Sequence, residues 1–531
     1  MFNKAIDIAR KIPLFLWLLP LYFIHLGYNE LFGFLPINLV VRDFLIVAAV
    51  TLFVLFCSRI YLQDYRKAFI YTFIFILFNL FFGFFHDSIK ALINIDFLTR
   101  YSIIVPLFFM CFIGFIIRLK KSDSLFYQTY SYFNALMIIL LVFETGVSIK
   151  NYNKIINTNN LIDNRFTVYK SFEKKGAGEV SIKPDIFFIV FDEMPSSSGL
   201  KKYFGVENKT LEDSLIKKGF FIVNNSKSNY TKTIFSMASI LNMDYLPGAE
   251  KLYENPATIF ACVNSISNNS LFSVLKFTKY KLRAFQPFSF TDTEMNPTPF
   301  FKDLRNGHYL NKTLTGRLYR DVLWNIYNID FSYIKKKYYS KELLSRNKRN
   351  KTILSTTELI KKLCSKNNSS DFFYGHYILP HSPYIFDKSG KLLDIDMGNP
   401  FRKSQNKSKL FLDQVSYANS IINDIVNHIQ QYNDPNTIII IMGDHGYRGE
   451  LSITDNTAPY DNFSAIYFPD KNYTSLHDSL SAVNTFRVVL NKYFNTQLPL
   501  LKNKSFVIAA EDDFDSEKTK RPVNSPTNPT H

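Results

Sequence analysis

The sequence predicts a helical membrane domain followed by an α/β domain with a central, mostly parallel sheet. Long apolar stretches are concentrated before about residue 150 of the 531-residue chain. After residue 184, apolar strand-like runs alternate with helical patterns, which is typical of a parallel sheet covered on both faces. One of these runs, TIIIIMGDHG at residues 437–446, ends in an Asp-His pair. Parallel strands usually present their chemistry at their carboxyl ends.

Five apolar stretches in residues 1–150 predict about five transmembrane helices, because a span takes about 20 apolar residues. They begin near residues 12, 44, 68, 101 and 132, and the second includes the apolar residues before Arg42. A secretory signal peptide is the alternative for the first stretch. Four more apolar stretches follow it and no small-residue cleavage site stands out, so we prefer a membrane helix.

Basic residues are concentrated in alternate loops between these stretches. The three clusters are Lys4, Arg10 and Lys11; Arg59, Arg66 and Lys67; and Arg118, Lys120 and Lys121. The intervening loops hold only Arg42, Lys90 and Arg100. The positive-inside rule then places the amino terminus in the cytoplasm, and an odd number of spans places the rest of the chain outside. We expect a multi-pass protein of the plasma or inner membrane with an extracytoplasmic domain.

Composition divides the rest of the chain into a polar linker at residues 151–183, an α/β domain at residues 184–508 and a disordered tail at residues 509–531. The formal charge of +17 does not indicate a nucleic-acid partner, because part of it is the loop bias and the rest is scattered. Cys57 and Cys111 lie in apolar stretches. Whether Cys262 and Cys364 pair is left open by the sequence.

Several predicted strands of the α/β domain end in side chains that can bind metal ions or carry out catalysis. The strand DIFFIVF delivers two acids, the segment DFFYGHYILPHSPY two histidines, and the isoleucine strand the Asp-His pair. A predicted helix, preceded by NYTK, begins with hydroxyl residues, whose alternative role is ordinary helix capping. The candidates are Asp192, Glu193, Thr231, Thr233, Ser236, His376, His381, Asp444 and His445. For His376, a structural role and a functional role remain equally open.

The order Asp192, Thr233, His381 and Asp444-His445 resembles the alkaline phosphatase superfamily. More narrowly, it is similar to the sulfatase-like, membrane-anchored branch, which includes lipoteichoic acid synthase and the phosphoglycerol and phosphoethanolamine transferases of bacterial envelopes. The most specific pieces are GDHG after the isoleucine strand and the segment PHSPY. The segment TKTIFSM resembles the nucleophile helix of the phosphoethanolamine transferases.

This resemblance covers about residues 184–507, and the five-span amino-terminal half also matches the transferases. It implies one divalent metal ion and a threonine nucleophile, Thr233. The implied metal ligands are Asp192, Thr233, Asp444 and His445. Oxygen and nitrogen ligands of this kind favour zinc or manganese, with magnesium or calcium as alternatives. The ion would activate the Thr233 hydroxyl, and His381 would protonate the leaving alkoxide or hold a phosphate oxygen.

Three departures from the family pattern limit what the resemblance implies. The transferases have Glu at the first ligand position, where this chain has Asp192 followed by Glu193, so either can be the ligand. Their nucleophile is flanked by cysteines that this segment lacks. No Cys-x-Pro-x-Arg segment is present, which argues against sulfate-ester hydrolysis.

We therefore expect a transferase that moves a phospho-headgroup, of the phosphoethanolamine or phosphoglycerol type, from a membrane lipid through Thr233 to an envelope glycan or lipid. The alternatives are a phosphodiesterase, phosphatase or sulfatase-like hydrolase on the same scaffold, and a receptor-like protein that has lost catalysis. The sequence identifies neither donor nor acceptor, nor the oligomeric state.

Overall fold

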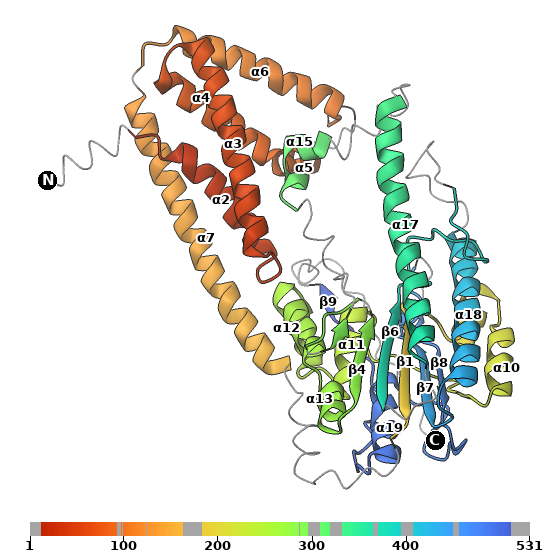
Figure 1. Cartoon of the computed structure of the whole chain (residues 1–531). Helices are drawn as coiled ribbons and strands as arrows, with labels where there is room; N and C mark the ends of the chain where they lie inside the picture. Colours follow the sequence, from red (N-terminus) through yellow and green to blue (C-terminus); the bar gives the residue numbers. More distant parts are fainter. Residues whose placement is uncertain are drawn as a thin grey trace. The chain divides into compact units, whose positions relative to one another are not determined.

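The computed structural model divides the chain into two compact units (Figure 1). The helical unit comprises residues 1–156, 301–341 and 396–400, and the sheet unit comprises the remaining residues. The structure describes residues 12–92, 97, 99–124, 126–162, 183–285, 287–291, 293–295, 308–318, 332–364, 370–394, 407–449 and 456–510.

Each of the five predicted apolar stretches is helical in the helical unit. The helices are α2 (Phe15–Glu30), α3 (Ile37–Leu62), α4 (Tyr65–Leu80), α5 (Phe82–Leu92), α6 (Tyr101–Lys121) and α7 (Tyr127–Ile162). Among the described residues, α3, α6 and α7 are long and apolar enough to span a membrane, and α4 with α5, bent by 64°, makes a fourth candidate. The 16 residues of α2 fall short of a full span. The count is thus three to four, where the sequence predicted five.

Two expected boundaries differ in the structure: the start of the linker at residue 151, and the start of the disordered tail at residue 509, since Ala509–Ala510 form a short strand. Helix α7 continues to Ile162, through residues 151–162 that we assigned to the linker. An established helix extends easily into polar sequence, because each added residue gains a hydrogen bond without a new nucleation cost. Residues 163–182, the rest of the predicted linker, and residues 511–531, in the predicted tail, lie outside the described part of the chain.

Residues 308–318, which we assigned to the α/β domain, pack in the helical unit instead, and we call them the strap. The strap contains two short helices, η2 (Leu310–Lys312) and α15 (Leu314–Arg317). The Tyr309 side chain is buried, and its hydroxyl donates a hydrogen bond to the backbone oxygen of Ile24 at 3.1 Å. A packing contact between residues so far apart in the chain leaves no local pattern in the sequence.

The sheet unit is built around a seven-stranded sheet in the order β2-β8-β7-β1-β6-β4-β5. Its strands are β1 (Asp185–Phe191), β2 (Phe221–Ile222), β4 (Lys281–Phe285), β5 (Glu294–Met295), β6 (Asp371–Tyr377), β7 (Thr437–Gly443) and β8 (Ser464–Tyr467). The central strands are parallel, as predicted, whereas β8 runs antiparallel to both β7 and β2. Two further short strands, β3 (Tyr253–Glu254) and β9 (Ala509–Ala510), pair separately.

Helices cover both faces of this sheet (Figure 1). They are α9 (Ser197–Phe204), α10 (Lys209–Lys217), α11 (Thr233–Asn242), α12 (Pro256–Ser267), α13 (Ser270–Phe277), α17 (Ser332–Leu363), α18 (Lys407–Tyr432) and α19 (Thr485–Tyr493). Alternate residues of β1 separate the two cores: Phe188 packs in the cluster that includes α11, α12, α13 and α19, and Phe187 in the cluster that includes α10, α17 and α18. Burial on both faces explains why these strands are continuous apolar runs.

Candidate active site

The three central strands β1, β6 and β7 end side by side and bring the predicted site residues together. Phe191 pairs with Gly443 on one side and with Tyr377 on the other, so the strand ends are in register. Gly443 is required at this point, because a side chain there would come within 2.2 Å of the Met194 carbonyl oxygen. Asp192 and Asp444 follow directly on their strands, and both are buried.

Four side chains form a cluster whose spacing suits a metal ion. The Nε2 atom of His445 lies 3.6 Å from Oδ1 of Asp192 and 3.5 Å from Oδ2 of Asp444. The Oγ1 atom of Thr233 lies 3.5 Å from Asp192 Oδ1 and 3.4 Å from His445 Nε2. Tetrahedral bonds of about 2.1 Å separate neighbouring ligand atoms by about 3.4 Å. Four of the six distances among the predicted ligand atoms are therefore those expected within one coordination shell.

The charges of this cluster also fit a divalent cation. Burial, together with the nearby Asp444 carboxylate, raises the pKa of Asp192 well above its usual value. The Oδ2 atom of Asp444 is buried and has no hydrogen-bond partner among the described residues. The other ring nitrogen of His445, Nδ1, lies 2.8 Å from the Gly446 carbonyl oxygen. When Nδ1 donates there, Nε2 presents its lone pair to the cluster, as a metal ligand must.

Thr233 is the first residue of α11, where the backbone N–H groups of the helix start can bind an anion. The residue at the helix N-cap is Lys232, and no side chain caps the helix. The alternative capping role of Thr231 and Thr233 is therefore not realised. Ser236, one turn further on, donates a hydrogen bond to the Asp444 backbone oxygen and so fixes the helix start against the end of β7.

His376 belongs to the same cluster, although the sequence left its role open. One ligand atom each from Asp192, His376 and Asp444 lie within 4.8 Å of one another. The Nδ1 atom of His376 lies 2.8 Å from the Tyr374 hydroxyl, and its buried Nε2 has no partner among the described residues. Burial lowers the pKa of His376 to about 4, so the ring is neutral at pH 7 and able to bind a metal.

The geometry favours Asp192 over Glu193 as the first ligand. Glu193 lies in a turn and has a positive backbone φ of 67°. Its backbone N–H donates to Asp444 Oδ1 at 3.0 Å, and its own Oε1 accepts a bond from the backbone N–H of Arg448 at 2.6 Å. Burial raises the pKa of Glu193 to about 7. Glu193 therefore positions Asp444 and the loop that carries Arg448.

His381 is held as a neutral ring beside two arginines. Its Nδ1 lies 2.6 Å from the Ser382 backbone oxygen, and its Nε2 lies 3.0 Å from a guanidinium nitrogen of Arg448. Arginine can only donate, so Nε2 accepts and Nδ1 carries the proton. Burial lowers the pKa of His381, and Arg448 and Arg349 lower it further. As a neutral ring, His381 can accept a proton at Nε2; the sequence predicted that it would donate one to the leaving alkoxide or hold a phosphate oxygen.

Sequence reasoning missed the two arginines of this site. Arg448 follows GDHG by two residues, and a cation in the glycine-rich loop after a ligand strand was a usable signal. Arg349 lies in the long polar helix α17 and gives no local signal. It donates to the backbone oxygens of His381 at 2.6 Å and Pro383 at 3.0 Å. Burial lowers the pKa of Arg349 to about 10, so it remains a cation at neutral pH.

The sequence also matches a model of a known protein family. The sulfatase family model matches residues 184–488, more than half of the chain. The chain belongs to the sulfatase family. This match confirms the predicted sulfatase-like α/β domain and the prediction that the protein is an enzyme. The cysteine-based sulfatase segment is absent, and Cys262 and Cys364 are free thiols in the sulfatase domain.

Solved structures show partial similarity to the chain. The periplasmic domain of EptC from Escherichia coli in complex with Zn is 10% identical, covers 60% of this chain and 84% of its own, and has a TM-score of 0.36. The lipoteichoic acid synthase LtaP from Listeria monocytogenes is 10% identical, with coverage of 66% of this chain and 81% of its own and a TM-score of 0.32. The soluble domain of lipooligosaccharide phosphoethanolamine transferase A from Neisseria meningitidis is 12% identical, with coverage of 58% of this chain and 87% of its own and a TM-score of 0.35. No curated protein matches the sequence significantly.

Proposed function

We propose that the protein is a membrane-anchored, metal-dependent transferase that moves a phospho-headgroup from a lipid to an envelope glycan or lipid through Thr233. One observation carries the proposal: the Thr233 hydroxyl lies at a helix start, 3.4 Å from His445 and 3.5 Å from Asp192. A threonine side chain inside a ligand cluster is poised to form a covalent intermediate.

The chemistry divides into two displacements at phosphorus. In the first, Thr233 Oγ1 bonds to the phosphorus of the lipid, the bond to the diacylglycerol oxygen breaks, and the proton lost by Thr233 passes to that oxygen. In the second, the acceptor hydroxyl bonds to the same phosphorus, and the bond to Thr233 breaks. A divalent ion held by Asp192, Thr233, Asp444 and His445 would lower the pKa of the threonine hydroxyl and offset phosphoryl charge. Zinc or manganese suits these ligands best.

The remaining residues of the site manage protons and charge. Neutral His381 accepts the proton of the acceptor hydroxyl through Nε2. Arg448 contacts that nitrogen, and its positive charge repels the protonated His381 ring. It therefore favours transfer of the proton from His381 to the Thr233 oxygen as that oxygen leaves. Its guanidinium also offers donors to phosphoryl oxygens. Nothing in this arrangement requires a nucleic acid.

The helical unit supports an extracytoplasmic position of the sulfatase domain. Hydrogen bonds join Phe15 to Asn134, and Asn29 to Glu144, so α2 and α7 run in the same direction. Helix α7 begins just after the basic end of α6, which carries Arg118, Lys120 and Lys121. With that end in the cytoplasm, α7 ends on the outer side of the membrane.

Intact-mass measurement of the full chain purified from native membranes tests the proposal. We expect a covalent adduct on Thr233 whose mass identifies the transferred group. Thr233→Ala should remove both the adduct and turnover while the protein stays folded, and Thr233→Ser should retain part of each. Full turnover by Thr233→Ala would contradict the transferase and leave a hydrolase that uses water as the nucleophile.

A further inference from the structure

The helical unit contains a pocket of about 580 Å³. Ligand pockets typically measure about 300–1,000 Å³. Its walls are apolar side chains of α2, α4, α5 and α7, several of them fully buried, such as Leu19, Phe23 and Phe73. On α2 the lining extends from Leu19 to Glu30, three turns or about 17 Å along the axis. One leaflet of a bilayer has a hydrocarbon thickness of about 15 Å. The part of α2 that lines the pocket is therefore about as long as one lipid acyl chain in a leaflet.

Four charged side chains line this otherwise apolar pocket. They are Glu30, Asp87, Lys312 and Arg317. Both acids belong to the helices, and both cations belong to the strap. Lys312 is paired with Glu30, and Arg317 forms a two-pronged ion pair with Asp87 at 2.6 and 3.0 Å. The two signs balance, so the four groups attract a ligand that carries both charges more than they attract an anion.

The strap is fitted to the helices at glycines, which indicates a built contact. A side chain at Gly27 would come within 2.4 Å of the Tyr309 ring. A side chain at Gly83 would come within 2.9 Å of the Lys312 backbone oxygen and 3.1 Å of the Arg317 guanidinium. Each helix therefore has a glycine where the strap approaches most closely, and the cations are held in place beside the pocket.

We propose that this pocket binds a zwitterionic phospholipid, with one acyl chain between the helices and the headgroup at the strap. The lipid phosphate would accept hydrogen bonds from Arg317 and Lys312, and its ammonium group would lie against Asp87 and Glu30. Bound in this way, the headgroup adds partners to both ion pairs without leaving a net charge. This binding site is separate from the proposed transfer at Thr233 and does not depend on it.

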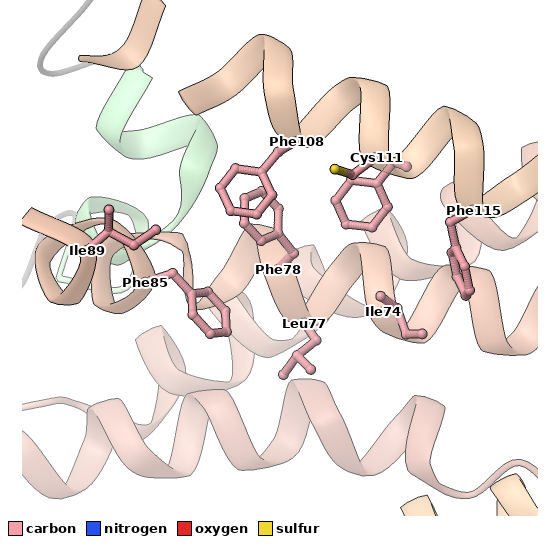
Figure 2. A pocket seen from close by; sticks show the side chains of 9 residues that line it. Ile74, Leu77, Phe78, Phe85, Ile89, Phe108, Cys111 and Phe115 are labelled. Atoms are coloured by element: carbon pink, nitrogen blue, oxygen red, sulfur yellow. The ribbon is translucent and has the colours of Figure 1, made fainter. Parts of the chain in front are cut away.

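A second pocket of the helical unit shows what an ordinary apolar crevice looks like. Figure 2 shows this pocket, of about 390 Å³, between α4, α5 and α6. Its lining side chains are apolar throughout: Ile74, Leu77, Phe78, Phe85, Ile89, Phe108, Cys111, Phe112 and Phe115. Without a charged group it can hold hydrocarbon but cannot select a headgroup. It therefore supplies matched control positions for a test of the first pocket.

Native mass spectrometry of the full chain tests the proposal, in a Thr233→Ala background so that no lipid is consumed. The probes are phosphatidylethanolamine, phosphatidylglycerol and diacylglycerol of equal chain length. We expect one retained phosphatidylethanolamine. Met137→Trp, which fills the pocket, should abolish retention, and Arg317→Gln should weaken it by about tenfold, the loss of one charge-assisted hydrogen bond. The control Ile89→Trp, which fills the second pocket, should leave retention unchanged.

Two results would overturn this proposal. Equal retention of diacylglycerol would show that the charged groups do not read the headgroup, and equal or stronger retention of phosphatidylglycerol would show that they read it as an anion site. The double variant Asp87→Arg with Arg317→Asp keeps the ion pair with its ends exchanged. If it restores retention lost in Arg317→Gln, the effect lies in charge balance and not in misfolding of the strap.

Discussion

The two units of the protein handle their acidic side chains in opposite ways. In the sulfatase domain, Asp192 and Asp444 are fully buried near the neutral imidazoles of His376 and His445, and one carboxylate oxygen has no hydrogen-bond partner among the described residues. In the helical unit, Glu30 and Asp87 are partly exposed, and each is paired with a cation of the strap. The buried acids of the sulfatase domain lack a nearby balancing charge, which predicts that a cation binds there. The acids beside the pocket of the helical unit are already balanced, which predicts a ligand with no net charge.

This difference has a consequence for stability. Without a bound cation, the charged form of Asp192 opposes folding, because it is buried and lies beside the Asp444 carboxylate. The sulfatase domain should therefore depend on its metal ion for part of its stability, and the helical unit should not. Measurements of unfolding with and without the metal ion can confirm or contradict this difference between the two units.

The largest effect is expected for Asp444→Asn. An amide is a weaker ligand than a carboxylate, so metal content should fall from one ion per chain to nearly none, and turnover should be lost. The amide oxygen can still accept the bonds that Glu193 and His445 donate to Asp444 Oδ1. The metal-free variant should therefore be at least as stable as the metal-free wild type. Elemental analysis and thermal unfolding with and without metal measure both effects.

A saturating ion at about 100 times its Kd stabilises a protein by about 2.7 kcal/mol, and this gain should vanish in the variant. Asp424→Asn is the matched control, since this acid lies on α18 with its side chain 53% exposed and should not affect metal content. Unchanged stoichiometry in Asp444→Asn would remove this residue from the site and break the comparison.

A moderate effect is expected for Arg448→Gln, which tests how the positive charges of the sulfatase domain act. Burial and the two arginines lower the pKa of His381 from 6.5. A neutral base is lost as pH falls through its pKa, so the rate of the wild type should decline only below pH 6.5. Removing the Arg448 charge should raise this pKa and move the decline to higher pH.

The pH dependence of kcat/KM measures this shift. Arg448→Lys keeps the charge and should leave the acid limb closer to that of the wild type, even where it lowers the rate through loss of the planar fork. An acid limb that stays in place in Arg448→Gln would mean that His381 is not the titrating base.

How much of this site could be predicted depended on where the information lies along the chain. Asp192 and the Asp444-His445 pair directly follow long apolar strands, and parallel strand ends meet at one edge, so their proximity followed from local patterns. Arg349 reaches the site from the middle of a long polar helix, and the strap packs about 280 residues from Gly27 in sequence. Such contacts are decided by tertiary packing, which no local pattern records.

The smallest effect is expected for Thr231→Ala, which tests whether Thr231 lies outside the cluster of metal ligands. Thr231 precedes the helix start, the N-cap position is held by Lys232, and no side chain caps α11. Replacing Thr231 should therefore change the free energy of unfolding by about 0.5 kcal/mol or less, the usual size for a substitution away from special features. Metal content and turnover should remain close to those of the wild type.

Thr233→Ala provides the contrast, because Thr233 is buried and lies within reach of two ligands, Asp192 and His445. The two hydroxyls are two residues apart and cannot occupy the same position in the cluster. Comparing the two alanine variants for turnover, adduct and metal content therefore assigns the nucleophile by difference. If Thr231→Ala lost turnover and Thr233→Ala kept it, the nucleophile would lie outside the ligand cluster. The proposal that the buried acids bind a metal ion that activates Thr233 would then be wrong.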